Sequence, residues 1–133
     1  MSVKSTANGV FSVEFLKFGV VGISGIAVDF FITWLFKEKL KINKYIANCA
    51  GFSFAVFNNF LWNRYWTFNN NIQPFGEQFL KFASISIIGL VINTLLLLIL
   101  VKYVKINFYL IKLLVIALVF LWNFYLNYLF TFQ

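Results

Sequence analysis

The one arginine of this 133-residue chain lies in a run of aromatic and polar residues, Asn63-Arg64-Tyr65-Trp66-Thr67-Phe68. A guanidinium can bind two phosphate oxygens at once, which a lysine ammonium cannot do. Lys17 and Lys81 each begin a long apolar stretch, and the order of the stretches predicts that both lysines lie at the same membrane face as Arg64. Three cations at one face could hold a phosphate. The alternative is that each of them contacts ordinary lipid headgroups.

Asparagines recur at helical spacing within two of the apolar stretches. Amides inside a membrane are costly unless they are paired, so these polar faces are expected to point into a helix bundle. They could join helices by hydrogen bonds worth about 1 kcal/mol each, or they could line a polar cavity for a substrate headgroup. The residues that share each face are Asn48, Asn59 and Asn63 in the second stretch, and Lys112, Asn123 and Asn127 in the fourth.

Asp29 is the one acid inside these stretches. An acid near the middle of a transmembrane helix costs about 3 kcal/mol on insertion. Helical spacing places Asp29 on the same face as Gly22 and Gly25, where helices can pack closely. Its carboxyl group could be a proton or substrate site. Alternatively, it could pair with Lys, Arg or Asn of another helix, or be kept protonated by burial.

Several kinds of catalytic or metal site are missing from the sequence. It has no histidine, and its single cysteine, Cys49, lies inside an apolar stretch. It also lacks a glycine-rich phosphate loop, a nucleophile elbow, zinc-ligand spacing and a carboxylate pair. We therefore expect no metal and no cofactor, and we do not expect a free-standing enzyme.

The basic residues are distributed as in a membrane protein. There are 11 Lys and Arg against 4 Asp and Glu, a net charge of +7. The cations lie at the ends of apolar runs and form no basic arm or face, so the expected partners are phosphates of membrane lipids and not nucleic acid. Hydrophobic residues make up 62% of the chain and charged residues 11%, against about 25% charged in soluble domains.

Four apolar stretches account for most of the chain, and each is about as long as a helix that crosses roughly 30 Å of hydrocarbon. Both parities of these stretches are apolar, which excludes a transmembrane barrel. The first and third connections are short and predict two helical hairpins. The stretches are residues 18–36, 45–62, 82–101 and 113–132.

The two hairpins are copies of each other, offset by 64 residues. We predict a single membrane domain over residues 1–133, with one repeat at about 15–68, the other at about 79–132, and a linker at 69–78. Each repeat crosses the membrane twice, so the two copies are expected to be parallel. The matched positions include Lys17 with Lys81, Gly25 with Gly89, Asp29 with Asn93, Asn59 with Asn123, Asn63 with Asn127, and Thr67-Phe68 with Thr131-Phe132.

This pattern resembles the GtrA-like family. The resemblance rests on Phe15-Leu16-Lys17-Phe18 at a helix start, Asp29 or Asn93 farther along, and Asn63-Arg64-Tyr65-Trp66-Thr67-Phe68 at the end of the second helix. It covers nearly all of residues 15–132. One departure is that the second copy has Tyr128 after Asn127, where members of the family often have arginine. A phosphate site is therefore expected to be asymmetric or completed by a second subunit.

The resemblance implies a small four-helix membrane protein that acts with polyprenyl-phosphate-linked sugars in cell-surface polysaccharide glycosylation. A similar region forms the membrane part of some dolichol-phosphate mannose synthases. The implied role is to flip or present a lipid-phosphate sugar made by a partner glycosyltransferase. Asn63 and Arg64 are the implied motif residues. Lys17, Lys81, Asp29, Asn59, Asn93, Asn123 and Asn127 complete the predicted substrate-binding set.

Two arguments about the orientation of the chain in the membrane disagree. Seven lysines lie in the first and third loops, against four cations on the opposite face, which by simple counting puts the termini outside. The resemblance implies cytoplasmic termini, where Arg64 would meet a lipid phosphate made inside the cell. We expect a multi-pass protein of the cytoplasmic membrane with cytoplasmic termini.

Two other functions stay open at the level of sequence. A small proton-coupled multidrug exporter would also have four helices and one membrane acid, and Asp29 could fill that part. A membrane scaffold that docks a glycosyltransferase without transport would need neither Asp29 nor Arg64. Because four short helices make a small bundle, a homo-oligomer is also expected.

Overall fold

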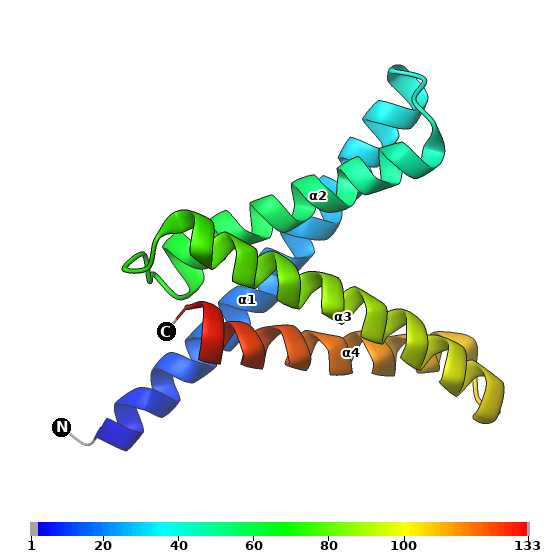
Figure 1. Cartoon of the computed structure of the whole chain (residues 1–133). Helices are drawn as coiled ribbons and strands as arrows, with labels where there is room; N and C mark the ends of the chain where they lie inside the picture. The colour runs from blue at the N-terminus through cyan, green and yellow to red at the C-terminus, as the bar shows by residue number, and fades with distance from the viewer. Residues whose placement is uncertain (1–2, 133) are drawn as a thin grey trace. The chain divides into compact units, whose positions relative to one another are not determined.

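The computed structural model of the chain describes residues 3–132, and the side chains of residues 12–108 and 110–132. All the regular structure in this part of the chain is helical. The chain divides into two compact units, Met1–Ile72 and Gln73–Gln133, and each contains one pair of helices (Figure 1). The all-helical class predicted from the sequence is confirmed.

The first unit is a helical hairpin with a capped turn. The Asn43 side chain accepts a hydrogen bond from the backbone N–H of Tyr45 at 2.8 Å and so starts the second helix. The connection before it turns at Lys41, whose φ is 57°. The segments of this unit, in order, are α1 (Val3–Trp34), the π-helical turn η1 (Leu35–Lys39), α2 (Lys44–Trp62) and the π-helical turn η2 (Asn63–Thr67).

The second unit repeats the hairpin. Its first helix begins directly after Pro74, a residue that lacks the N–H which the first helical turn would leave unbonded in any case. For that reason the helix starts inside segment 69–78, where the sequence suggested a linker. The segments are α3 (Phe75–Tyr103), α4 (Phe108–Leu126) and the π-helical turn η3 (Asn127–Thr131).

The two hairpins use the same buried positions with residues of different size. In α2 the buried stripe that packs on α1 is Ala47, Gly51 and Ala55. Sixty-four residues later the buried stripe of α4 is Ile111, Val115 and Val119, which packs against Ile92, Leu96, Leu97 and Leu100 of α3. Small residues let helix backbones approach closely. The first hairpin therefore has an intimate helix contact, whereas branched side chains fill the corresponding contact of the second.

Gly51 marks the closest part of the contact between α1 and α2. A Cβ atom there would overlap the Thr33 hydroxyl and the Asp29 carboxyl group, and would lie 2.7 Å from the Asp29 carbonyl oxygen. We expect Gly51→Ala to lower the free energy of unfolding by about 1–3 kcal/mol. Gly22→Ala is the matched control, because no atom lies within 4 Å of its added Cβ. That change should be neutral or stabilising by up to about 1 kcal/mol. Thermal unfolding in detergent micelles measures both, and equal effects would contradict the close contact.

Three segments are long and apolar enough to cross a membrane: Ser12–Lys39, Phe75–Tyr103 and Leu110–Thr131. The remaining helix, α2, is less apolar because it carries Asn48, Asn58 and Asn59. It packs along α1, and its 19 residues extend about 28 Å at 1.5 Å per residue. The chain is an integral membrane protein with four helices in two hairpins.

Candidate functional site

Each hairpin ends in the same π-helical turn. The Asn63 carbonyl oxygen accepts the N–H of Phe68 at 3.0 Å, and the Asn127 carbonyl accepts the N–H of Phe132 at 3.0 Å. The last phenylalanine then packs its ring edgewise against a phenylalanine in the first helix of the same hairpin. The matched ring pairs are Phe18 with Phe68, at 6.2 Å between centroids, and Phe82 with Phe132, at 6.1 Å.

The side chains of the two turns differ in their hydrogen bonds, although the residue types are the same. In the second hairpin, the Thr131 hydroxyl donates to Asn127 Oδ1 at 2.7 Å, and Asn127 Nδ2 donates to the Asn123 carbonyl at 2.7 Å. In the first hairpin, Asn63 is 1% exposed and Thr67 is 4% exposed. Neither Asn63 Oδ1 nor Thr67 Oγ1 has a hydrogen-bond partner among the described residues. Buried polar atoms are nearly always paired, so unpaired ones are candidate positions for a ligand. The second hairpin has such atoms as well, at Trp122 Nε1 and Asn123 Oδ1, but not in its turn.

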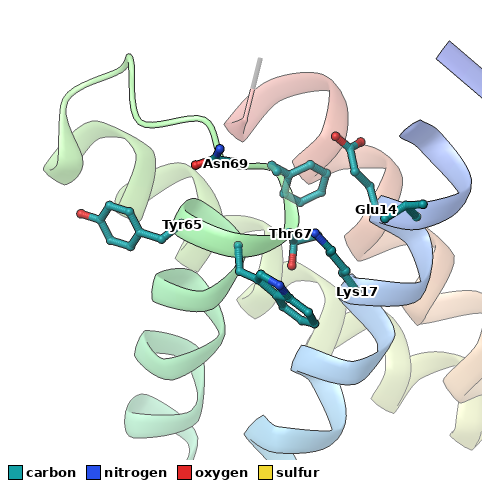
Figure 2. Close-up of a pocket in the computed structure, with 8 residues that line it drawn as sticks. Glu14, Lys17, Tyr65, Thr67 and Asn69 are labelled. Atoms are coloured by element: carbon teal, nitrogen blue, oxygen red, sulfur yellow. The ribbon is translucent and has the colours of Figure 1, made fainter. Parts of the chain in front are cut away.

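A pocket of about 510 Å³ lies beside the turn of the first hairpin. Lys17 reaches from α1 towards Thr67 across this pocket (Figure 2). The Lys17 ammonium lies 5.0 Å from the centroid of the Trp66 ring, a distance suited to a cation–π contact. A cation and a threonine thus line one hollow, and the threonine hydroxyl oxygen is itself buried. The lining residues are Val13, Glu14, Lys17, Tyr65, Trp66, Thr67, Phe68 and Asn69.

The equivalent lysine of the second hairpin has two polar partners. Lys81 Nζ lies 3.9 Å from the Glu77 carboxylate and donates to Gln73 Oε1 at 3.1 Å. Lys81 lines a second pocket of about 460 Å³ together with Phe130, which is the counterpart of Trp66. No described carboxylate lies within 4.0 Å of the Lys17 ammonium. Glu14 lines the same pocket as Lys17 and interacts electrostatically with it, but the two groups form no ion pair within 4.0 Å. Lys17 is therefore less closely paired than Lys81.

Arg64 lies on the same turn as Thr67 but does not line the pocket. Its side chain is 6% exposed, its guanidinium lies 5.4 Å from the Tyr65 ring centroid, and Nη2 is 3.5 Å from the carbonyl oxygen of Asn71. Such burial does not fit a side chain that extends into lipid headgroups. The structure brings Lys17, Asn63 and Thr67 to one end of the first hairpin and places the Arg64 charge next to them.

Apart from Asn127, which begins the turn of the second hairpin, the other predicted site residues lie deeper in the hairpins. A Cβ atom at Gly25 would overlap the Asn59 amide, and one at Gly89 would lie 2.7 Å from Asn123 Oδ1, so a glycine faces an asparagine in both copies. Asp29 accepts a hydrogen bond from the Thr33 hydroxyl at 3.1 Å, and no described cation pairs with it. The positions of the set are Asp29 in α1, Asn59 in α2, Asn93 in α3, Asn123 in α4 and Asn127 in η3.

Of the residues that line the pocket, only Lys17 was in the predicted binding set, and two of the others, Thr67 and Trp66, bear on its chemistry. Thr67 belongs to the repeated pair Thr67-Phe68 and Thr131-Phe132, and that repetition could have marked it. Trp66 is a pocket wall that holds the Lys17 ammonium, whereas tryptophan at a helix end is otherwise typical of membrane interfaces. A hydroxyl and an aromatic face thus join the predicted cation.

Comparison with known proteins agrees with this architecture. The chain is 38% identical over 79 residues to a dolichol-phosphate mannosyltransferase of Pyrococcus furiosus, a match that covers 59% of this chain and 22% of that relative. The chain thus spans about a fifth of the length of this curated relative. Residues 17–132 match the model of the family described as "GtrA/DPMS, transmembrane domain". The chain belongs to the GtrA/DPMS transmembrane-domain family.

Proposed function

We propose that this protein binds the phosphate of a polyprenyl-phosphate-linked sugar and translocates or presents that lipid for cell-surface glycosylation. The observation that carries the proposal is the difference between the two turns. Asn63 and Thr67 hold buried polar atoms without described partners, and Thr67 lines the pocket with Lys17, while the matched atoms of Asn127 and Thr131 bond each other. Family membership supports a role with lipid-phosphate sugars.

The chemistry of the pocket suits a phosphate joined to a sugar. The Lys17 ammonium and the Thr67 hydroxyl can both donate hydrogen bonds to phosphate oxygens. Asn63 does not line the pocket, but its buried Oδ1, one helical turn before Thr67, is an acceptor that lacks a described donor. The aromatic ring of Trp66 offers a flat apolar wall next to the cation. Arg64 lies on the same turn without lining the pocket, and its positive charge attracts the phosphate through space.

The partner in this proposal is a membrane-associated glycosyltransferase that makes or uses the lipid. The relative from Pyrococcus furiosus bears the name of such an enzyme, and this chain matches 22% of it. We propose that the present chain is the non-catalytic membrane part of an equivalent pair. Its termini are then cytoplasmic, so that the pocket meets a lipid phosphate made inside the cell.

The position of Asp29 favours a packing role over a proton-coupled site. Its carboxyl accepts the Thr33 hydroxyl within α1 and lies against Gly51 of α2, where even a methyl group would not fit. A drug substrate has no room on that side of the carboxyl group. The geometry around Asp29 therefore gives no support to the alternative function of a proton-coupled multidrug exporter.

Matched lysine variants test the phosphate site. We expect Lys17→Gln to weaken binding of undecaprenyl phosphate to the purified protein at least about tenfold, because a charge-assisted hydrogen bond is worth about 1.5–3 kcal/mol. Lys81→Gln should bind within about twofold of wild type, since Lys81 is already paired with Glu77. Native mass spectrometry with added lipid measures both. If the two variants retain undecaprenyl phosphate equally, or lose it equally, the proposed phosphate site is wrong.

A further inference from the structure

The pocket of the first hairpin contains a carboxyl group as well as an ammonium group. Glu14 and Lys17 are the charged residues of its lining, and both side chains leave α1 on the side of the pocket (Figure 2). The formal charges of these two side chains cancel. An anion that binds at Lys17 is therefore received next to a negative charge, which a phosphate site does not by itself require.

The Glu14 carboxyl group has no close partner in the structure. It interacts electrostatically with the Lys17 ammonium, but the two groups do not approach within 4.0 Å of each other. The ammonium lies instead beside the Trp66 ring, 5.0 Å from its centroid. One carboxyl oxygen, Glu14 Oε2, is buried without a hydrogen-bond partner among the described residues. Because buried polar atoms are nearly always paired, this position of an acid calls for a role beyond packing.

The second hairpin shows that the fold does not need a carboxyl group at this position. Gln78 stands 64 residues after Glu14, and its side chain is fully buried. The acid of the second hairpin, Glu77, stands at the position of Val13 and lies 3.9 Å from the Lys81 ammonium. Lys81 lines the pocket of about 460 Å³, but neither Glu77 nor Gln78 does. Of the two pockets, the first alone has an acid in its lining.

The charge of a lipid phosphate changes when its sugar is removed. A polyprenyl phosphate joined to a sugar is a phosphodiester, which carries one negative charge. The lipid that has given up its sugar, here called the spent lipid, is a phosphate monoester. With a second pKa of about 6, a monoester carries a charge of about −1.5 to −2 at pH 7 and nearly −2 at pH 8. The two lipids have the same hydrocarbon tail, so a protein can separate them only by the headgroup.

The charges around the pocket match the singly charged headgroup. Lys17 lines the pocket, and Arg64 lies on the same turn as Thr67 without lining it. The Glu14 carboxylate offsets one of these two positive charges. A bound phosphodiester then leaves the site close to neutral, whereas a monoester brings a further negative charge that the carboxylate repels.

We infer that Glu14 makes the pocket selective for the sugar-linked lipid, with its one negative charge, over the doubly charged spent lipid. The inference rests on the proposed function, since it takes the lipid phosphate to bind at Lys17 and Thr67. It adds the residue that sets the preference and the property that this residue detects, which is charge. A protein with this preference does not compete for the spent lipid after a glycosyltransferase has removed the sugar.

Three lipids separate the effect of charge from that of the sugar. Undecaprenyl-phosphate glucose has one charge and a sugar, undecaprenyl methyl phosphate has one charge and no sugar, and undecaprenyl phosphate has nearly two charges at pH 8. Each lipid is added to the purified protein in detergent micelles at pH 8, and native mass spectrometry gives its affinity.

Two matched variants are compared with wild type. Glu14→Gln removes the charge and keeps the shape, and Gln78 shows that the fold accepts an amide at the matching position. Glu77→Gln is the control, because Glu77 is an exposed acid of α3 that lines neither pocket.

We expect wild type to bind both singly charged lipids at least about fivefold more tightly than undecaprenyl phosphate. Glu14→Gln should bind undecaprenyl phosphate within about twofold of the sugar lipid, or more tightly, because the repulsion is gone. Glu77→Gln should keep the wild-type preference.

Several results would overturn the inference and leave the proposed function in place. One is equal affinity of wild type for the three lipids, and another is an unchanged preference in Glu14→Gln. A third is that undecaprenyl methyl phosphate binds wild type as weakly as undecaprenyl phosphate, because the pocket would then recognise the sugar and not the charge. If Glu14→Gln binds none of the lipids, the carboxyl group supports the fold and the inference is wrong. Failure of wild type to bind any of the three lipids removes the proposed function itself.

Discussion

Replacing Thr131 with valine is expected to lower the free energy of unfolding by about 1–3 kcal/mol, whereas the same change at Thr67 should leave it unchanged or raise it. The Thr131 hydroxyl donates to the buried Asn127 Oδ1 at 2.7 Å, so its removal strands that acceptor. The Thr67 hydroxyl is buried without a described partner, so its removal strands nothing. Unfolding of the purified variants in detergent micelles, with circular dichroism as the readout, gives the two values.

The effects of these two variants should be reversed when lipid binding is measured, with Thr67→Val impaired and Thr131→Val nearly normal. Thr67→Val removes a hydroxyl that lines the pocket next to Lys17, and we expect affinity for undecaprenyl phosphate to fall about tenfold. Thr131→Val should bind within about twofold of wild type when measured below its unfolding temperature. A residue that lowers stability and raises affinity is the expected signature of a binding site.

A serine control separates the hydroxyl from the shape of the side chain. Thr131→Ser keeps the donor to Asn127 and should lose much less stability than Thr131→Val. If Thr67→Val and Thr131→Val destabilise the protein equally, the two turns have the same hydrogen bonds in solution. The difference between the hairpins, and with it the phosphate site, would then have to be abandoned.

The arrangement of the helices could be predicted because it follows from chain-wide patterns. Apolar stretches of membrane length predicted the helices, and the short connections predicted the hairpins. The 64-residue offset also carried detail: Phe18 and Phe68 pack in the first hairpin as Phe82 and Phe132 do in the second. The parallel orientation of the two copies stays a prediction.

The difference between Lys17 and Lys81 was visible in the sequence, although their pairing was not predicted. Glu77 precedes Lys81 by four residues, a spacing that brings the two side chains together on a helix. Val13 stands at the matching position before Lys17. The flanking residues thus predict the ion pair of Lys81 with Glu77, but they also place Glu14 three residues before Lys17, where helical spacing brings the two side chains near each other.

The difference between the two turns could not be predicted from residue types. Asn63 and Thr67 are identical to Asn127 and Thr131, yet only the latter pair is hydrogen-bonded among the described residues. Side-chain rotamers and packing decide whether the threonine hydroxyl reaches the asparagine amide. The alignment of the two repeats matches residue types and does not give either one. Arg64 shows the same limit, because its charge suggested an exposed phosphate ligand and the structure buries it.

Three substitutions of Arg64 should separate packing from charge, and Arg64→Ala is expected to lose both. The side chain is 6% exposed and lies over the Tyr65 ring, so truncation removes a buried stem. We expect the free energy of unfolding to fall by about 2–4 kcal/mol. Affinity for undecaprenyl phosphate should also fall by more than about tenfold, because two unit charges about 8 Å apart attract by about 2 kcal/mol at an effective dielectric constant of about 20.

Arg64→Met and Arg64→Lys then distinguish the contributions. Methionine keeps an apolar stem of similar length without charge, so we expect near-native stability with the affinity of Arg64→Ala. Lysine keeps the charge, and we expect it to retain affinity within about threefold. That rescue is expected because Arg64 does not line the pocket and acts on the phosphate through its field. If Arg64→Lys binds as poorly as Arg64→Met, the two-pronged guanidinium itself holds the phosphate, and the turn must open to expose it when lipid enters.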